Sequence, residues 1–426
     1  MKNLFSARHF FVLPLALLLA ACAAPRPAPE PVKPPVATAP APIAAPTPAP
    51  IVQAEPLPVE PKAPVSALTT PPPALQPSSF DALPGWRQDE LIRAWSGFLH
   101  GCTVLQAQAG WQNVCRESAG VDPRDSAAIR SFFESRFQVY RVVNPDGSYE
   151  GLVTGYYEPL VRGSRTRSTR YPFPLYGVPK DLLTVDLTSL YPDLKNMRLR
   201  GRLDGTRVVP YYSRAEIEAG SAPLAGNELY YIDDIVELFF LQIQGSGQIQ
   251  LDDGSIARVG YADQNGHPYR SVARVLSDRG ELPLARTSMQ GIKEWGRANP
   301  AKLNDVLNQN PSYVFFKELP LNLPGPLGTL RTPLIGEHAI AVDQRVIPLG
   351  APVYLDTTYP ASAQRLQRLV MAQDTGGAIR GAVRADFYWG SGEEAGKQAG
   401  RTKQKGRMWV LLPREFDTSG WIATGR

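Results

Sequence analysis

The sequence predicts a mainly β fold with a few helices at the start of the folded region, arranged as compact barrels rather than as β-α-β layers. From Val139 onward, short β-prone runs alternate with Gly, Pro and Asp-Gly turns. Many short strands separated by turns are typical of barrels and sandwiches. The folded part, from about residue 80 to residue 426, is longer than one typical domain, so we expect two domains.

The first 21 residues have the features of an export signal. Lys2 and Arg8 give a positive start, a short apolar run from Phe10 to Leu19 follows, and small residues precede Cys22. An apolar run this short does not span a hydrocarbon core of about 30 Å. The pattern therefore indicates a cleaved signal rather than a permanent transmembrane helix.

The tetrad Leu-Ala-Ala-Cys that ends at Cys22 resembles the signal of bacterial lipoproteins, in which the cysteine is lipidated and becomes the new N-terminus. The next residue, Ala23, is typical of sorting to the outer membrane. We expect a lipoprotein signal peptide at residues 1–21 and an anchor at Cys22 on the periplasmic side of the outer membrane, where several acyl chains hold better than one. The alternative is a plain secretory signal.

Residues 22–79 form a Pro/Ala-rich segment. Between Pro25 and Pro77 proline recurs at about every third position, which removes backbone donors and favours an extended polyproline II conformation. We expect a tether that lets the folded part search a layer below the membrane. A spacer without any length requirement is the alternative.

The elements of the folded part follow from its hydrophobic patterns. Apolar residues recur at helical spacing in Asp89–His100 and Ser126–Phe137, and one more helix is expected at Thr287–Arg297. The β-prone runs are Gly151–Tyr157, Leu229–Ile232, Val236–Ile243, Val353–Leu355, Leu369–Ala372 and Met408–Leu412. Asp-Gly pairs at 146–147, 204–205 and 253–254 predict turns between them.

Charge and cysteine content exclude several classes of function. A formal charge of +5 is small for 426 residues and no dense Lys/Arg cluster occurs, so we expect no nucleic acid partner, whereas a mild basic bias suits an anionic polymer. Apart from Cys22 the cysteines are Cys102 and Cys115, which form either a disulfide in an oxidising compartment or two buried thiols. No Cys/His cluster has zinc spacing, so neither a metal nor a cofactor is expected.

Three aspartates, Asp343, Asp374 and Asp386, concentrate near the carboxy-terminal end. Strand-like segments lead into glycine-rich turns there, and glycine lets the backbone approach a ligand closely. Asp386 is followed directly by aromatic residues. Sugar rings stack on flat apolar faces, so an acid beside aromatic rings suits a carbohydrate site. A single Asp-Gly or Asp-aromatic step is usually only a turn, but three in one segment favour a functional site.

Six stretches in order give the folded part a resemblance to the membrane-bound lytic murein transglycosylase A (MltA) family. They are Leu83–Trp86 with Cys102, Thr154–Tyr157, Phe239–Gly247, Asn265–Tyr269, Asn310–Phe316 and the three-aspartate block. The resemblance implies a double-psi β-barrel domain made of residues 80–162 and 313–426. A second β-domain, residues 163–312, is then inserted between these parts and forms the other wall of a groove for the glycan.

The resemblance also implies site residues. Asp386 is then the catalytic acid, with Asp374 and Thr154 beside it. The residues expected to bind substrate are Tyr156, Tyr157, Gln242, Gln244, Gly245, Ser246, Gly247, Asp343, Tyr388 and Trp389. Alternatives remain open for these residues: core packing for the aromatic rings, a tight turn for the glycines, support of a barrel loop for Asp343, and a strand cap for Thr154.

The implied activity is that of a lytic exotransglycosylase acting on the β-1,4 bond between N-acetylmuramic acid and N-acetylglucosamine in peptidoglycan. Protonating the bridging oxygen needs a neutral acid, yet a free Asp has a pKa near 3.9. Burial or a neighbouring charge, for which Asp374 is the candidate, must raise it. The same carboxylate then acts as base on the muramic C6 hydroxyl, leaving a 1,6-anhydro end, whereas ordinary glycosidases use two carboxylates.

Two other functions stay open on the sequence alone. One is a glycan hydrolase in which Asp374 and Asp386 act as a pair and water is the acceptor; the other is a non-catalytic peptidoglycan-binding lipoprotein. Asp374-Thr-Gly also matches the aspartic protease signature, but no second such step occurs at a comparable strand end. The expected partners are peptidoglycan glycan strands, the outer membrane, and complexes of cell-wall synthesis or hydrolysis.

Overall fold

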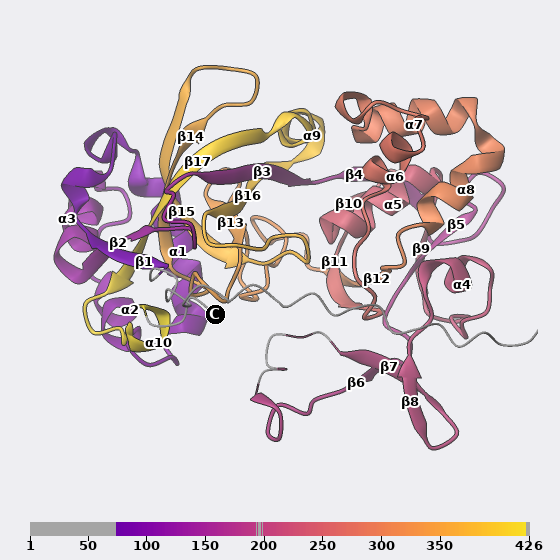
Figure 1. Ribbon diagram of the computed structural model, residues 1–426, viewed down its shortest axis with the longest axis horizontal. Helices are drawn as coiled ribbons and strands as arrows, with labels where there is room; N and C mark the ends of the chain where they lie inside the picture. The colour runs from indigo at the N-terminus through magenta and orange to yellow at the C-terminus, as the bar shows by residue number, and fades with distance from the viewer. Residues whose placement is uncertain (1–73, 193, 195–196, 198, 423–426) are drawn as a thin grey trace, which may run out of the picture. The chain divides into compact units, whose positions relative to one another are not determined.

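The computed structural model of the chain describes residues 74–192, 194, 197 and 199–422 (Figure 1). The predicted signal peptide, Cys22 and the predicted tether as far as residue 73 lie outside the described residues. The folded part begins before residue 80, because strand β1 (Leu75–Ser78) pairs antiparallel with β2 (Phe137–Val142). The last residues assigned to the tether are therefore part of a sheet. Among the described residues, no helix is long and apolar enough to cross a bilayer.

Six strands form a closed ring, the barrel. The pairing order runs β17, β14, β15, β13, β16 and β3, and a further pairing of β3 with β17 closes it. Their bounds are β3 Gly151–Glu158, β13 Ala339–Val342, β14 Pro352–Thr358, β15 Arg365–Asp374, β16 Arg384–Ser391 and β17 Lys403–Pro413. Two pairs in the ring are parallel, β13 with β15 and β3 with β16, and the others are antiparallel.

Helices from both ends of the described chain pack beside the barrel strands. The helices and helical turns of this part are η1 Phe80–Ala82, η2 Trp86–Gln88, α1 Leu91–Leu105, α2 Gln112–Ser118, α3 Ser126–Arg136, α9 Gly392–Arg401 and α10 Ser419–Ile422. α1 packs on β15, and its Trp95 and Phe98 form an aromatic cluster with Phe132 and Phe133 of α3. These rings belong to the main hydrophobic core together with the inward side chains of the barrel.

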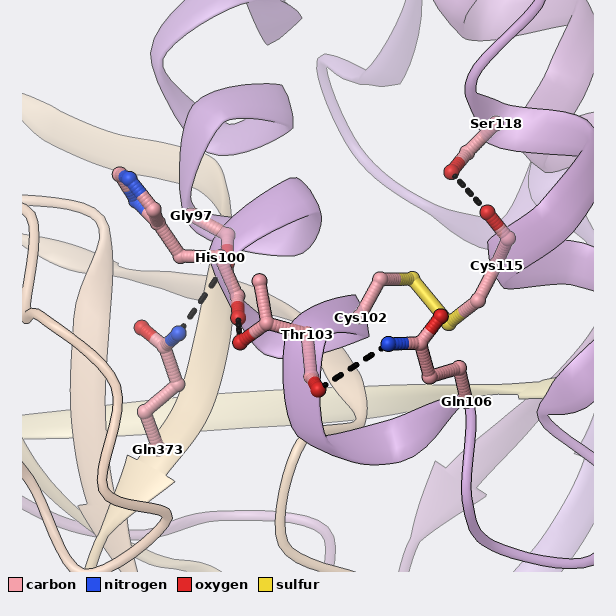
Figure 2. Close-up of a disulfide and its surroundings, with 8 residues drawn as sticks. All are labelled: Gly97, His100, Cys102, Thr103, Gln106, Cys115, Ser118 and Gln373. Atoms are coloured by element: carbon pink, nitrogen blue, oxygen red, sulfur yellow. Dashed lines mark hydrogen bonds between the residues drawn. A yellow bond between two sulfur atoms is a disulfide. The ribbon is translucent and has the colours of Figure 1, made fainter.

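A disulfide joins Cys102 of α1 to Cys115 of α2 (Figure 2). Close to it, the buried amide of Gln373 donates from β15 to the backbone oxygen of Gly97 on α1 (3.1 Å). A cross-link between helices restricts the unfolded chain. The disulfide ties α1 to α2, and the hydrogen bond from Gln373 ties α1 to β15, the strand that ends at Asp374.

Between β3 and β13 the chain forms a second, six-stranded sheet in the order β12-β11-β10-β4-β9-β5. Its strands are β4 Leu160–Ser164, β5 Phe173–Tyr176, β9 Glu228–Ile232, β10 Ser246–Leu251, β11 Ile256–Gln264 and β12 Val314–Leu319. A small sheet, β6 Leu183–Thr184, β7 Arg200–Asp204 and β8 Arg207–Pro210, lies in the same stretch of chain. The helices there are α4 Arg214–Glu218, α5 Ile235–Gln244, α6 Val272–Asp278, η4 Leu284–Arg286, α7 Met289–Ala298 and α8 Pro300–Asn308.

The predicted fold class is confirmed: the described chain is mainly β, with a barrel, an inserted second β-region and helices at its start. The prediction of one element was wrong. Val236–Ile243 was predicted as a strand and lies in helix α5. Asp234 caps the first turn by accepting from the backbone of Val236 and Glu237, and Gly245 ends the helix in the left-handed conformation.

Candidate active site

The alternation of strand residues separates two faces of the barrel wall. On β16, Ala385 and Phe387 belong to the main core, whereas Tyr388 belongs to a smaller cluster that includes Tyr156 and Ala341. Because successive side chains of a strand point to opposite faces, Asp386 lies on the same face as Tyr388. The carboxylate is therefore held by a rigid strand but is directed away from the main core.

The register of the strands brings the predicted catalytic residues together. Ala341 of β13 pairs with Asp386 on one side and with Asp374 on the other. Asp386 in turn pairs with Thr154 of the parallel strand β3. Thr154, which is 232 positions from Asp386 in the sequence, thus lies beside Asp386 on the barrel wall, and Asp374 lies nearby.

Among the residues that the structure describes, the side-chain donor to Asp386 is the hydroxyl of Thr154, whose Oγ1 lies 2.5 Å from Asp386 Oδ1. Arg384 in turn donates from Nη2 to Thr154 Oγ1 (2.9 Å). Burial raises the pKa of Asp386 from its ordinary value of 3.8 to about 6. The hydrogen bond from Thr154 and the charge of Arg384 lower this pKa, and the charge of Asp374 raises it further.

The second oxygen of Asp386 is in a different situation. Among the described residues no donor is bonded to Oδ2, and this oxygen is not one of the buried side-chain atoms that lack a partner. It is therefore accessible from solvent. An oxygen that is open to solvent on a carboxyl group with a raised pKa is what a proton donor to a bound substrate requires.

Asp374 is held by donors on both of its oxygens. Oδ1 accepts from the backbone of Thr329 (3.0 Å), the hydroxyl of Thr329 (2.9 Å) and the backbone of Thr375 (2.9 Å), and Oδ2 accepts from the hydroxyl of Tyr156 (3.0 Å). Burial raises the pKa of Asp374, while these hydrogen bonds act in the opposite direction. Four donors and no exposed lone oxygen make it a fixed neighbour of Asp386.

Three of the predicted sugar-stacking rings belong to the core instead. Tyr156 and Tyr388 are 8% and 1% exposed and pack on each other, with ring centroids 5.1 Å apart. Trp389 is 7% exposed and donates from Nε1 to the hydroxyl of Thr402 (2.8 Å). All three side chains are buried among protein atoms, and Tyr156 contacts Asp374 through its hydroxyl.

Asp343 is bonded within the barrel and supports a loop. It is 2% exposed and forms an ion pair with Arg345, with contacts of 2.9 and 2.6 Å. It also accepts from the backbone of Gly381 in the loop before β16 (2.9 Å). These hydrogen bonds and the charge of Arg345 outweigh the effect of burial and lower the pKa of Asp343. Both of its oxygens are thus used within the barrel.

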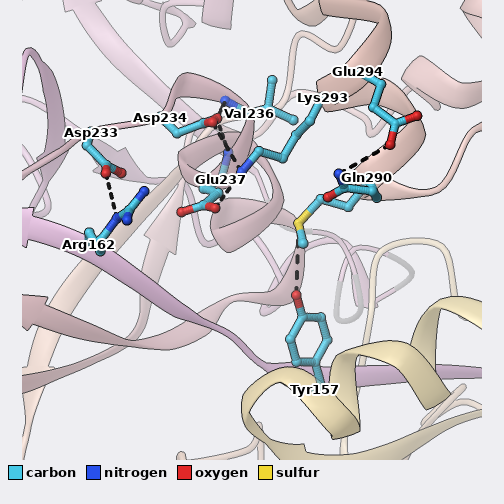
Figure 3. Close-up of polar contacts among 10 residues, drawn as sticks. Tyr157, Arg162, Asp233, Asp234, Val236, Glu237, Gln290, Lys293 and Glu294 are labelled. Atoms are coloured by element: carbon cyan, nitrogen blue, oxygen red, sulfur yellow. Dashed lines mark hydrogen bonds and ion pairs between the residues drawn. The ribbon is translucent and has the colours of Figure 1, made fainter.

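Tyr157 connects β3 to the helices of the inserted region (Figure 3). Its backbone N–H donates to the side chain of Gln244 at the end of α5 (3.1 Å), and its hydroxyl approaches the sulfur of Met289 on α7 (3.9 Å). Burial, and then the charge of Glu237, raises the pKa of Tyr157 to about 12. Tyr157 is half-buried, so of the four predicted aromatic residues it retains the most open ring.

Lys293 of α7 ties the first turn of α5 in place (Figure 3). Its ammonium lies 2.5 Å from a carboxylate oxygen of Glu237 and 3.1 Å from one of Asp234. Two acids on one lysine keep the start of α5 against α7.

The remaining predicted binding residues lie where α5 turns into β10. Gln242 is 3% exposed and Ser246 8% exposed. Gly245 has φ +78°, and a Cβ on Gly247 would come within 2.2 Å of Leu241. Backbone conformation and close packing thus account for both glycines, and the side chain of Gln244 accepts a hydrogen bond from β3.

Sequence reasoning missed two residues of the site, Thr329 and Arg384. Thr329 comes from a loop without secondary structure, and no local pattern indicates that it will meet Asp374. Arg384 stands two positions before Asp386, which on a strand means the same face. That spacing is a usable signal for Arg384.

Comparisons with known proteins agree with this arrangement. The family model described as the MltA specific insert domain matches residues 152–317, and the 3D domain model matches residues 338–412. Membrane-bound lytic murein transglycosylase A of Escherichia coli strain K12 is 37% identical over 266 residues, which are 61% of this chain and 64% of that relative. The chain thus spans slightly less than two thirds of the length of this curated relative.

Solved structures extend the likeness over most of the described chain. The crystal structure of MltA from Neisseria gonorrhoeae is 42% identical with a TM-score of 0.71, and the match covers 80% of this chain and 93% of that one. The crystal structure of Escherichia coli MltA with bound chitohexaose is 28% identical with a TM-score of 0.58, covering 81% and 95%. This chain belongs to the membrane-bound lytic murein transglycosylase A family.

Proposed function

We propose that this protein is a lytic transglycosylase that cleaves the β-1,4 bond between N-acetylmuramic acid and N-acetylglucosamine in peptidoglycan. The observation that carries the proposal is the state of Asp386, a half-buried carboxyl with a pKa of about 6 and an open Oδ2. Near neutral pH an appreciable fraction of such a group carries a proton, which an ordinary aspartate does not. The neutral form protonates the bridging oxygen as positive charge develops at C1.

Asp386 also serves as the base. Once the leaving sugar has taken the proton, the carboxylate accepts the proton of the muramic C6 hydroxyl, whose oxygen bonds to C1 and forms the 1,6-anhydro ring. The proton lost in the first step is regained in the second, so no water is consumed. A pKa of about 6 suits both directions because neither state is strongly favoured at working pH.

Asp374 supports the single-carboxylate mechanism over a hydrolytic pair. A hydrolase of the paired type needs its second carboxylate to take a proton from water. Both oxygens of Asp374 already accept hydrogen bonds from Thr329, Thr375 and Tyr156. Asp374 would have to lose one of these bonds to act as base, whereas in its present place its charge raises the pKa of Asp386.

The substrate class is supported by the relative that binds a glycan. Chitohexaose is bound in the Escherichia coli MltA structure, and we propose that glycan strands of peptidoglycan occupy the corresponding region here. Tyr157 and Gln244 are the predicted binding residues that remain available, since they lie where β3 meets the inserted region.

We further propose the setting of the reaction. Signal cleavage before Cys22, lipidation of that cysteine and the Pro/Ala-rich tether would place the enzyme on the periplasmic side of the outer membrane, facing the wall. The proposed division is a catalytic barrel domain of residues 80–162 and 313–426 with residues 163–312 inserted. The pairing of β12 with β11 extends the inserted sheet to Leu319, beyond that boundary. We also propose that the protein contacts complexes of cell-wall synthesis or hydrolysis.

The test is digestion of purified peptidoglycan sacculi, followed by mass spectrometry of the released fragments. We expect 1,6-anhydro ends from the wild-type protein and no release by Asp386→Asn, with Asp81→Asn, an exposed acid, as the control. Products about 18 Da heavier with reducing ends would instead indicate the hydrolase. Binding of sacculi without release by the wild type would indicate the non-catalytic alternative.

A further inference from the structure

Arg384 is a charged residue of the site to which the proposed reaction assigns no role. It lies on β16 two positions before Asp386, and its guanidinium makes three contacts. Nη2 donates to Thr154 Oγ1 (2.9 Å), while Nη1 donates to the backbone oxygens of Leu152 (3.3 Å) and Ala385 (2.5 Å). The two backbone bonds fix the guanidinium across β3 and β16, and the third contact is aimed at the partner of the catalytic carboxyl.

The contact with Thr154 has a direction that chemistry imposes. A guanidinium has donors and no acceptor, so the hydroxyl oxygen of Thr154 must be the acceptor in this bond. The single hydroxyl proton of Thr154 is then free to be donated elsewhere, and Asp386 Oδ1 is 2.5 Å away. The hydrogen bonds therefore run in one direction only, from Arg384 to Thr154 and from Thr154 to Asp386.

We propose that Arg384 is a positioning residue of the proposed transglycosylase: through Thr154 it fixes Oδ1 of Asp386 as a hydrogen-bond acceptor and so assigns the transferable proton to Oδ2. This inference rests on the function proposed above. The assignment matches the geometry, because Oδ2 is the oxygen that solvent reaches. A threonine hydroxyl that could turn away would let the proton of Asp386 settle on the inward oxygen, out of reach of a substrate.

The same contact limits the rise in the pKa of Asp386. The charge of Arg384 and the hydrogen bond from Thr154 both lower the pKa of Asp386, against burial and the charge of Asp374. The other charged or titratable groups near Asp386 include Tyr156, Tyr388 on the same face of β16 and, opposite Thr154 on β17, the exposed Lys403. β13 contributes only Ala341 at this level. Arg384 is thus the cation bonded to the hydroxyl that contacts Asp386.

The test measures the pKa of the Asp386 carboxyl directly, by ¹³C NMR of purified full-length protein labelled at the aspartate carboxyl carbons. The resonance is assigned by its loss in Asp386→Asn. We expect Arg384→Gln to raise this pKa by about 1, and Arg384→Lys to raise it less because the charge stays. Arg380→Gln is the matched control, since Arg380 is exposed and bonds neither Thr154 nor Asp386.

A double-variant cycle separates positioning from bulk charge. In a Thr154→Val background Arg384 has no hydroxyl to act through, so we expect Arg384→Gln to lose about half of its effect or more. Thr154→Ser keeps the hydroxyl and should restore the full effect. Equal effects in both backgrounds would overturn the proposal in favour of a simple charge effect. An unchanged pKa in folded Arg384→Gln, with a lower melting temperature, would reduce Arg384 to a structural link between strands.

The pH dependence of turnover provides a second test. Because the acid must be protonated, activity should fall as pH rises through about 6, and this decline should move to higher pH in Arg384→Gln, as the carboxyl pKa does. The NMR result stands even if the wild-type protein releases no muropeptides. In that case the proposed function fails, but the NMR measurement still decides whether Arg384 positions the carboxyl group of Asp386.

Discussion

At the scale of single residues, two aspartates with the same side chain take different roles because their surroundings differ. Asp374 accepts four hydrogen bonds, whereas Asp386 accepts one and keeps an open oxygen. Burial raises the pKa of both carboxyl groups, so the difference between them lies in their hydrogen bonds. Neither difference is visible in the sequence, where both are simply Asp within a glycine- and aromatic-rich block.

The raised pKa of Asp386 predicts a stability cost. The folded state holds the proton more tightly than the unfolded chain, so stability falls as pH rises from the ordinary value of 3.8 through about 6. We expect Asp386→Asn to raise the free energy of unfolding at pH 8 by about 1–3 kcal/mol, the upper figure being the difference in pKa at about 1.4 kcal/mol per unit. At pH 3.5 the gain should disappear.

Urea unfolding at the two pH values measures this effect. Asp81→Asn is the control, because Asp81 is almost fully exposed and its replacement should change little at either pH. If Asp386→Asn is destabilising at pH 8, the carboxylate is better solvated in the folded protein than its burial implies, and the acid role loses its physical basis.

At the scale of elements, the sequence predicted what local patterns determine. The strand around Thr154 and the helix at Ser126 follow from alternation and from helical spacing, and both lie where expected. α5 was missed because its apolar run also suits a strand, and only the caps Asp234 and Gly245 distinguish the two. Thr329 could not be predicted, because its meeting with Asp374 depends on how a loop folds over the barrel.

The close pairing of β3 with β16 depends on Gly155. A Cβ at this position would lie 2.6 Å from Nε1 of Trp389 and 2.8 Å from Oγ1 of Thr402, two buried groups bonded to each other. We expect Gly155→Ala to cost about 1–3 kcal/mol through overpacking. It should also slow turnover, because Thr154 and Asp386 face each other across the same pair of strands.

Thermal unfolding and the rate of muropeptide release test this together. Gly400→Ala on α9 is the matched control, since its Cβ would meet nothing within 4 Å. Alanine favours a helix over glycine by up to about 1 kcal/mol, so the control should be neutral or stabilising. A Gly155→Ala variant with wild-type stability would mean that Trp389 can move, and that the wall carrying Asp386 is less rigid than its packing indicates.

At the scale of the whole described chain, one buried carboxylate links the barrel to the inserted sheet. Glu158 ends β3 and is fully buried. It lies 2.9 Å from Nε of Arg258 on β11, accepts from Gln248 on β10 (3.0 Å), and accepts from Ser391 on β16 (2.5 Å). The chain passes directly from Glu158 into β4 of the inserted sheet, so this group fixes the point where the two sheets meet.

Breaking this pair should destabilise the protein far more than breaking an exposed one. Glu158→Gln keeps the size of the side chain but leaves the buried guanidinium of Arg258 without a counter-charge, which typically costs about 3–5 kcal/mol. Glu393→Gln on α9 breaks an exposed pair with Lys397 and should change the stability little. Denaturant unfolding followed by tryptophan fluorescence compares the two variants.

The pair also bears on whether the barrel and the inserted sheet unfold as one unit. If Glu158 couples them, Glu158→Gln should turn one transition into two, because each sheet has its own hydrophobic core and only the link is weakened. Adding Arg258→Met removes the stranded charge and should recover part of the lost stability without restoring a single transition. A single, equally cooperative transition in Glu158→Gln would show that the apolar contacts near β3 and β10 couple the sheets, and that Glu158 merely fills a polar place between them.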